Sequence, residues 1–155
     1  MLGSATTSLD AALYRLNSPK LAAVLFDASR RGVRLRLVLD LGKHQSDAET
    51  RRLLEIYQLP FRLLRGRRGA DSKMHHKFVI LDNRLLLTGS YNWTTESDEE
   101  NFENLVVLAN AGLVQSYREE FEALWNEAGE HSGNSRTSGG ESDPRPYGSA
   151  GKHPA

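Results

Sequence analysis

The chain has 155 residues, which is enough for one domain, and its 20 lysines and arginines are balanced by 20 acidic residues. Because the net charge is zero, any attraction for an anionic ligand must be local. The absence of cysteine excludes disulfides and thiolate metal sites. No apolar run approaches the roughly 20 residues of a membrane-spanning helix.

The N-terminal stretch MLGSATTSLDAALYRL lacks a basic region followed by a long apolar core. It is therefore a poor signal peptide. With neither a signal peptide nor a membrane span visible, the location is left open, with the cytoplasm as the default.

The first third of the chain alternates strand and helix patterns. Residues 9–16 are interpreted as a strand, although this stretch taken alone is ambiguous with a helix. Ser18 can cap a helix that has Pro19 at its first position and ends at Gly32. Residues 33–39 alternate apolar side chains with arginines, which predicts a second strand.

A second helix and a third strand follow. Ser46 and Glu49 form a capping box, which predicts a helix from that point to Pro60. Residues 61–65 form a short apolar strand. This alternation predicts an α/β fold, with a mixed sheet flanked by helices on both faces.

A basic segment connects this region to the next strand. It reads either as a solvated loop or as the rim of an anion-binding site, and both interpretations stay open. Its position directly before an apolar strand favours the rim, since phosphate-rich substrates gain affinity from such a patch. The candidate substrate-binding residues are Arg65, Arg67, Arg68 and Lys73.

Residues 74–81 and 85–88 are two apolar runs so close together that they predict a hairpin. If the turn centres on Asn83 and Arg84, four polar side chains share one face of that hairpin. In this register one cross-strand pair is Lys77 with Ser90, and the next is His75 with Asn92.

This quartet suits phosphodiester chemistry. The imidazole of His75 can attack phosphorus or protonate a leaving oxygen near neutral pH. Lys77 supplies positive charge, and Ser90 and Asn92 supply donors to the non-bridging oxygens. No carboxylate cluster accompanies them, so we expect no metal and no other cofactor.

The spacing of these residues is also that of a known family. The pattern H-x-K, four residues, Asp, six residues, G-S-x-N falls at His75, Lys77, Asp82, Ser90 and Asn92. It resembles the signature of the phospholipase D superfamily, and the stretch NFEN downstream resembles its follow-on motif. The similarity covers roughly residues 9–127. A strand and a helix that usually precede this region in the family are missing here.

The signature occurs once, which resembles the single-motif members that build one active site from two subunits. The resemblance implies a homodimer with a shared site. It also implies metal-independent hydrolysis in which His75 attacks phosphorus to form a phosphohistidine. His75 of the partner subunit then protonates the leaving alcohol.

Four other residues need separate interpretation. Asp82 is a catalytic candidate by the signature, yet its place at the turn favours a structural role. Glu103 either orients an imidazole or is an ordinary charge at the start of a strand. Trp93 either stacks on a base, touches lipid or packs in the core. His76 points away from His75 and is expected to be a packed histidine.

The remaining chain completes the domain. Residues 94–100 are predicted as an acidic loop and residues 102–108 as a strand. An amphipathic helix follows, and its apolar stripe is assigned to the core: Leu113, Tyr117, Phe121, Leu124 and Trp125. The domain is placed at residues 1–128, and residues 129–155 are expected to form a disordered polar tail.

Three functions stay open. An endonuclease on DNA or RNA is the main hypothesis, because of the arginine-rich loop. The alternative is a phospholipase D or cardiolipin hydrolase, which would need an apolar membrane-docking surface that the sequence does not reveal. The third is an inactive nucleic-acid-binding scaffold.

Overall fold

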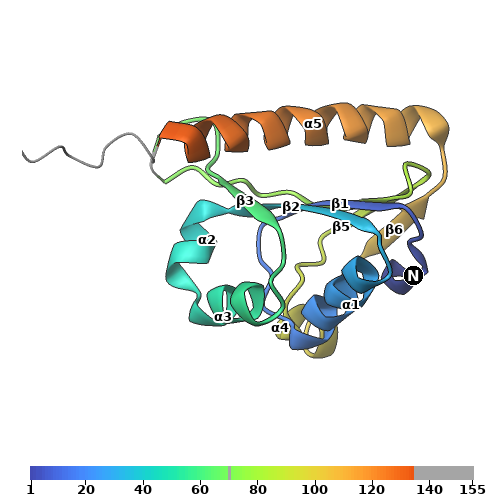
Figure 1. Ribbon diagram of the computed structural model, residues 1–155, viewed down its shortest axis with the longest axis horizontal. Helices are drawn as coiled ribbons and strands as arrows, with labels where there is room; N and C mark the ends of the chain where they lie inside the picture. Colours follow the sequence, from blue (N-terminus) through green and yellow to red (C-terminus); the bar gives the residue numbers. More distant parts are fainter. Residues whose placement is uncertain (70, 135–155) are drawn as a thin grey trace, which may run out of the picture.

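The computed structural model describes residues 1–69 and 71–134, and its centre is a six-stranded sheet with the order β3-β2-β1-β4-β5-β6 (Figure 1). The strands are β1 (Ser8–Leu13), β2 (Arg34–Asp40), β3 (Phe61–Leu64), β4 (Lys77–Leu81), β5 (Leu85–Gly89) and β6 (Leu105–Leu108). The helices are the 3₁₀ turn η1 (Leu2–Ser4), α1 (Pro19–Arg30), α2 (Leu41–Ser46), α3 (Ala48–Ile56), α4 (Thr95–Glu99) and α5 (Ala111–Asn134).

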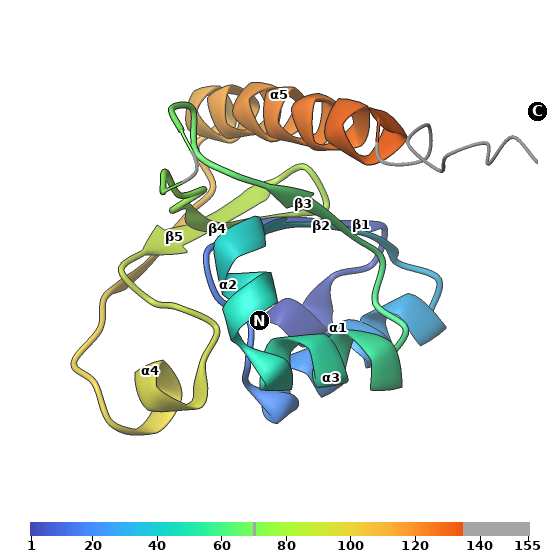
Figure 2. The same cartoon turned by 90° about the vertical axis from the view of Figure 1, so that its left-hand side faces the viewer.

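The sheet is mixed. Strands β1, β2 and β3 are parallel, since helices carry the chain back between them. Strands β4, β5 and β6 are antiparallel, and β4 joins the two halves by pairing with β1. Helix α5 covers one face of the sheet, while α1, α2 and α3 lie on the other (Figures 1 and 2). The predicted fold class is confirmed.

Two apolar clusters hold these layers together, one on each face. Successive residues of a strand point to opposite faces, so Val79 packs toward α1 and α3 while Phe78 packs toward α5. Phe121 of α5 is buried in the second cluster. Most of the aromatic stripe of α5 therefore belongs to the core as predicted, although Leu113 at its start is 45% exposed.

Local capping explains where the helices begin. Ser18 Oγ accepts the Leu21 N–H at 3.3 Å, and Pro19 takes the first position of α1, as predicted. The predicted helix cap at Ser46 is wrong by one residue. The cap of α3 is Asp47, whose carboxylate accepts the N–H groups of the first turn.

Two short helices were not predicted. Helix α2 is capped by Asp40, whose carboxylate accepts the Lys43 N–H at 2.8 Å. Helix α4 lies within the segment expected to be a loop and is capped by Thr94. Both are a few residues long and have no periodic apolar pattern, so a cap residue was their only sequence signal.

The predicted hairpin register is also wrong by one residue. The turn has three residues rather than two, because Asp82 belongs to the turn and not to β4. Phe78 pairs with Thr88, which brings Lys77 level with Gly89 instead of Ser90. Asp82 and Asn83 both have positive φ angles, of 52° and 53°, a conformation that these two residue types tolerate.

The turn is fixed by the carboxylate of Asp82. It accepts the backbone N–H groups of Thr6, Thr7 and Ser8 at 2.8–3.1 Å. Partial burial opposes ionisation, but these N–H donors outweigh it and hold the pKa of Asp82 well below its usual range. The turn thereby binds the segment that leads into β1.

Helix α5 runs to Asn134, past the expected domain boundary at residue 128. Ala128 is fully buried and anchors this part of the helix. The expected tail therefore begins with helix. Its remainder, residues 135–155, lies outside the described residues.

We expect Asp82→Ala to lower the free energy of unfolding by about 1–3 kcal/mol, because three backbone donors lose their acceptor. Since the pKa is depressed in the fold, the wild-type advantage is complete above the unfolded pKa of about 3.9 and shrinks below it. Denaturant unfolding at several pH values measures this. Arg84→Ala in the same turn is the control, and equal losses for both variants would contradict the assigned role of Asp82.

Candidate active site

His75 and Lys77 lie where β4 begins, beside the end of β1. Lys77 pairs with Leu13, the last residue of β1, and the Tyr14 N–H donates to the His76 carbonyl at 2.8 Å. These bonds fix the backbone on both sides of His75. Because side chains two residues apart share one face, His75 and Lys77 point the same way.

The two side chains are in contact. Lys77 Nζ lies 3.2 Å from His75 Nδ1 and donates to the His75 carbonyl at 2.9 Å. The ring of Tyr14 packs against the imidazole with centroids 4.3 Å apart, and Lys77 Nζ lies 5.2 Å from the Tyr14 ring centroid. Tyr14 thus forms a wall against which both catalytic candidates rest.

The electrostatics favour a neutral imidazole. Partial burial, together with the positive charges of Lys77 and Lys73, lowers the pKa of His75 below its usual 6.5. Burial also lowers the pKa of Lys77, an effect that the carboxylate of Glu103 opposes. At neutral pH His75 therefore has a free lone pair beside a lysine, which suits nucleophilic attack on an anionic phosphodiester.

Ser90 and Glu103 form a second part of the site. Ser90 Oγ donates to Glu103 Oε2, and Ser97 Oγ donates to Glu103 Oε1 at 2.9 Å. The two hydroxyls lower the pKa of Glu103, which is further lowered by the charge of Lys77. The electrostatic interaction between Glu103 and Lys77 places this network next to the histidine–lysine pair.

Gly89 makes this arrangement possible. The Ser90 N–H donates to the Asn104 side chain at 2.8 Å, and the Asn104 N–H donates to Ser90 Oγ at 3.1 Å. A Cβ at position 89 would lie 2.2 Å from the Asn104 carbonyl oxygen. The glycine of the G-S-x-N pattern is thus required by the close approach of the segment that contains Glu103.

Asn92 and Trp93 follow on a segment that pairs with the continuation of β1. The Trp93 N–H donates to the Arg15 carbonyl, and its own carbonyl accepts from Asn17. Trp93 is only 5% exposed and packs in the core, so it offers no free stacking surface. Asn92 Oδ1 is buried and has no hydrogen-bond partner within residues 1–69 and 71–134, a situation that often marks a functional group.

The basic loop borders the site but is not part of the same network. Arg67 is 87% exposed and lies 3.9 Å from Glu120, and Arg68 and Lys73 are also exposed. Arg65 is held by a backbone bridge to Lys73. Of this loop, Lys73 is among the charges that lower the pKa of His75.

Two residues lie apart from the His75–Lys77 pair: the catalytic candidate Asp82, and His76, which was expected to be a packed histidine. Asp82 lies in the turn at the opposite end of β4 from His75, in agreement with the structural role expected for it. His76 turns toward α5, where Nε2 lies 3.3 Å from Glu120 Oε1.

Sequence reasoning missed Tyr14 and Ser97. The position of Tyr14 directly after a strand was a usable signal, because residues at strand ends commonly line sites in α/β sheets. Ser97 had no signal, since it reaches Glu103 only through the unpredicted helix α4.

Among residues 1–69 and 71–134, no three His, Cys, Asp or Glu side chains gather in a way that could hold a metal ion. In the same part of the chain, no helix is long and apolar enough to cross a membrane.

Comparison with known proteins identifies the family to which this chain belongs. The family described as "Cardiolipin synthase, PLD-like domain" matches residues 1–125, which include every residue of the site. The chain belongs to the phospholipase D-like family. Curated proteins that it resembles are named cardiolipin hydrolase or phospholipase D.

Curated relatives include the mitochondrial cardiolipin hydrolases of Chlamydomonas reinhardtii and Homo sapiens. The algal protein is 34% identical over 125 residues, covering 81% of this chain and 54% of the relative. The human protein is 35% identical over 125 residues, covering 80% and 48%. The chain thus spans about half the length of these relatives.

Two solved structures agree with the fold. Nuc from Salmonella typhimurium, described as a phospholipase D family member, has a TM-score of 0.70 and 29% identity over 81% of this chain and 82% of its own. NucT from Helicobacter pylori has a TM-score of 0.74 over 81% and 82%, and its 20% identity supports the fold alone.

We expect the pKa of His75 to lie below 6.5 and to rise in Lys77→Met, since burial and the lysine charge both disfavour the imidazolium. Titration of the imidazole signals by NMR measures it. Lys20→Met is the control, because Lys20 is paired with Asp98 and is not among the charges that act on His75. An unchanged His75 pKa in Lys77→Met would contradict the assigned electrostatics.

Proposed function

We propose that this phospholipase D-like chain hydrolyses the phosphodiester bond of a phospholipid, without a metal ion, through a phosphohistidine on His75. The observation that supports this most is the contact of the His75 imidazole with the Lys77 ammonium, beside the Ser90–Glu103 network. A low-pKa imidazole next to a fixed positive charge combines a nucleophile with an anion-binding group.

In the first step, a lone pair of the neutral His75 imidazole attacks phosphorus, and the bond between phosphorus and the leaving alcohol oxygen breaks. The ammonium of Lys77 stabilises the charge on the non-bridging oxygens, and we assign the amide N–H of Asn92 as a second donor to them. Glu103, held by two serine hydroxyls, balances the positive charge of the site.

The leaving oxygen needs a proton, and we propose that it does not come from another histidine within the described residues 1–69 and 71–134. His76 faces Glu120 on the other side of the strand. A homodimer with a two-fold axis at the site would bring in His75 of the partner subunit as the acid. In the second step that imidazole accepts a proton from water, the water oxygen bonds to phosphorus, and the phosphorus–nitrogen bond breaks.

The phospholipid is favoured as the substrate because the relatives with 34% and 35% identity are named cardiolipin hydrolases. This reverses the preference for a nuclease drawn from the arginine-rich loop. The preceding Arg62, on β3, adds no support to the loop, since its guanidinium lies 3.9 Å from the Trp125 ring centroid and donates to the Trp125 carbonyl.

Single-stranded DNA or RNA is the second candidate. Arg67 and Lys73 are exposed and line the same hollow as His75, and they could hold phosphates beside the scissile one. Assays on labelled single strands and on cardiolipin or phosphatidylglycerol vesicles decide between the two classes. Binding of nucleic acid without turnover of any diester would instead identify a scaffold.

We expect hydrolysis to persist in excess chelator and an acid-quenched reaction to leave a phosphoryl group on His75. The reason is that the site offers its own positive charge and nucleophile. Mass spectrometry of the quenched protein locates the adduct. His76→Ala is the control and should still form it. An adduct on His76, or activity that returns only when a divalent ion is restored, would refute the mechanism.

We also expect mixed dimers of wild type and His75→Ala to be inactive. If both copies of His75 serve one site, activity at fixed total protein should fall as the square of the wild-type fraction after random remixing. Co-refolding over a range of ratios tests this. A linear decline would mean that each subunit holds a complete site.

A further inference from the structure

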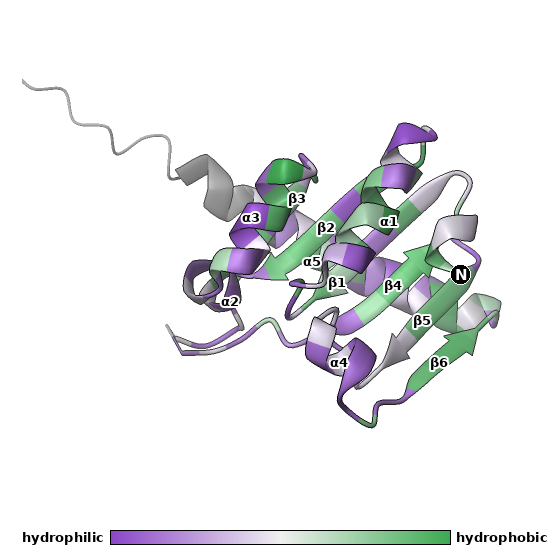
Figure 3. Cartoon of the chain, turned by 90° about the horizontal axis from the view of Figure 1, so that it is seen from below, coloured by the Kyte–Doolittle hydropathy of each residue, from purple (hydrophilic) through white to green (hydrophobic). Residues whose placement is uncertain are grey.

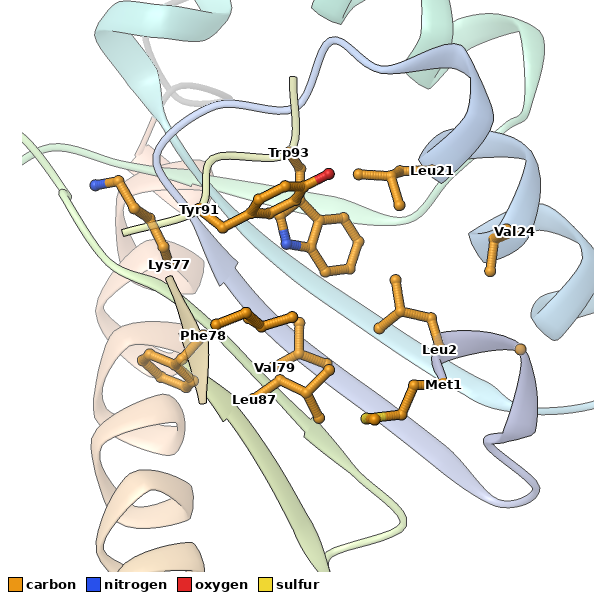
Figure 4. A pocket seen from close by; sticks show the side chains of 12 residues that line it. Met1, Leu2, Leu21, Val24, Lys77, Phe78, Val79, Leu87, Tyr91 and Trp93 are labelled. Carbon is orange, nitrogen blue, oxygen red and sulfur yellow. The ribbon is translucent and has the colours of Figure 1, made fainter. Parts of the chain in front are cut away.

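An apolar pocket of about 280 Å³ lies between helix α1, the turn η1 and strands β4 and β5 (Figure 4). On the face opposite α5, helices α1, α2 and α3 lie toward β1, β2 and β3, and much of β4, β5 and β6 is left in open view (Figure 3). The pocket is lined by Met1, Leu2, Gly3, Leu21, Val24, Lys77, Phe78, Val79, Leu87, Tyr91, Trp93 and Leu105.

This pocket is continuous with the active site through one residue. The stem of Lys77 lines the end of the pocket, while its ammonium points out of it (Figure 4) and contacts His75. Tyr91 lines the same end and stands between Ser90 and Asn92 in the sequence. A substituent of the phosphorus atom held at Lys77 would therefore lie at the pocket mouth.

The lining offers almost nothing for a polar ligand to bind. The hydroxyl of Tyr91 is already committed to Asp98 at 2.9 Å, and burial and this bond raise the pKa of Tyr91 to about 12. The Lys77 ammonium points outward, and the other side chains are aliphatic or aromatic, with the indole N–H of Trp93 as the one further polar side-chain group among them (Figure 4). A sugar or base would lose its hydrogen bonds to water here, whereas a hydrocarbon chain would gain about 25 cal/mol per Å² buried.

The surface around the mouth has the same character. Met1 is 65% exposed and Leu105 52%, and the neighbouring Val107 and Phe102 are also exposed. Leu105 and Val107 are on the same face of β6 as the pocket, since they pair with Gly89 and Leu87 of β5. This is the apolar surface that a lipid enzyme needs and that the sequence did not reveal.

We propose that the pocket binds an acyl chain of the phospholipid whose phosphate is held at His75 and Lys77. The inference rests on the proposed function and adds the position of the lipid: the ammonium of Lys77 binds the phosphate and its stem borders the acyl chain. Apolar cavities of about 150 Å³ already take up a benzene, so the pocket can hold part of one chain. The occupant stays attached to phosphorus through both steps.

The test compares the water-soluble diester bis(p-nitrophenyl) phosphate with dibutanoyl, dipentanoyl and dihexanoyl phosphatidylglycerol, each below its micelle concentration. For the wild type, kcat/KM should rise about fourfold for each methylene that the pocket buries. In Val24→Phe, which fills the pocket from α1, this rise should disappear, and the ratio of lipid to soluble-diester turnover should fall at least about tenfold.

Ile56→Phe is the matched control. It adds the same ring to a 57%-exposed position on α3 outside the pocket and should keep the wild-type ratio. A chain-length dependence that survives Val24→Phe would overturn the acyl site, as would equal rates for all chain lengths with intact turnover of the soluble diester. If the wild type does not hydrolyse the soluble diester at all, the proposed function itself is overturned.

Discussion

The geometry of the site depends on how the Asp82 carboxylate is bound. Its bonds to the backbone of Thr6, Thr7 and Ser8 are possible only if Asp82 sits inside the turn. The turn then has three residues, and this sets the register of β4 against β5. A shift of one residue would turn every side chain of a strand to the other face. The turn at one end of β4 therefore determines which residue lies beside Lys77 at the other.

That register explains why the G-S-x-N pattern begins with a glycine, Gly89. Lys77 is level with Gly89, and the missing side chain lets the Asn104 backbone approach β5. Glu103 then reaches Ser90 and Ser97 and acts electrostatically on Lys77. Four separate segments between positions 77 and 104 thus meet at one point.

Much of this could be predicted from sequence, and the failures have physical reasons. Strand alternation and the Ser18 cap are local signals, so the α/β order and the start of α1 were correct. The hairpin register was not, since the partners of Asp82 lie more than 70 residues away in the sequence. The same limit hid Tyr14, which reaches His75 only because β1 pairs with β4.

The exposed apolar surface on β6 is a second feature that the sequence alone did not reveal. In the sequence, Leu105 and Val107 look like core residues of a strand, and only the position of β6 at the sheet edge exposes them. The arginine-rich loop therefore favoured a polyanion at the level of the sequence, because arginines are visible there and an uncovered sheet face is not. The preceding Arg62, on β3, is used for packing against Trp125.

The protonation state of His75 determines which catalytic role the residue can take. Burial and the charges of two lysines favour its neutral form, which suits a nucleophile but not an acid. If two copies of the residue meet across a dimer axis, each imidazolium also disfavours the other, so the pair titrates as a unit with one proton between them. The singly protonated pair contains one nucleophile and one acid. Symmetry then gives one residue type both roles, since either subunit can hold the proton.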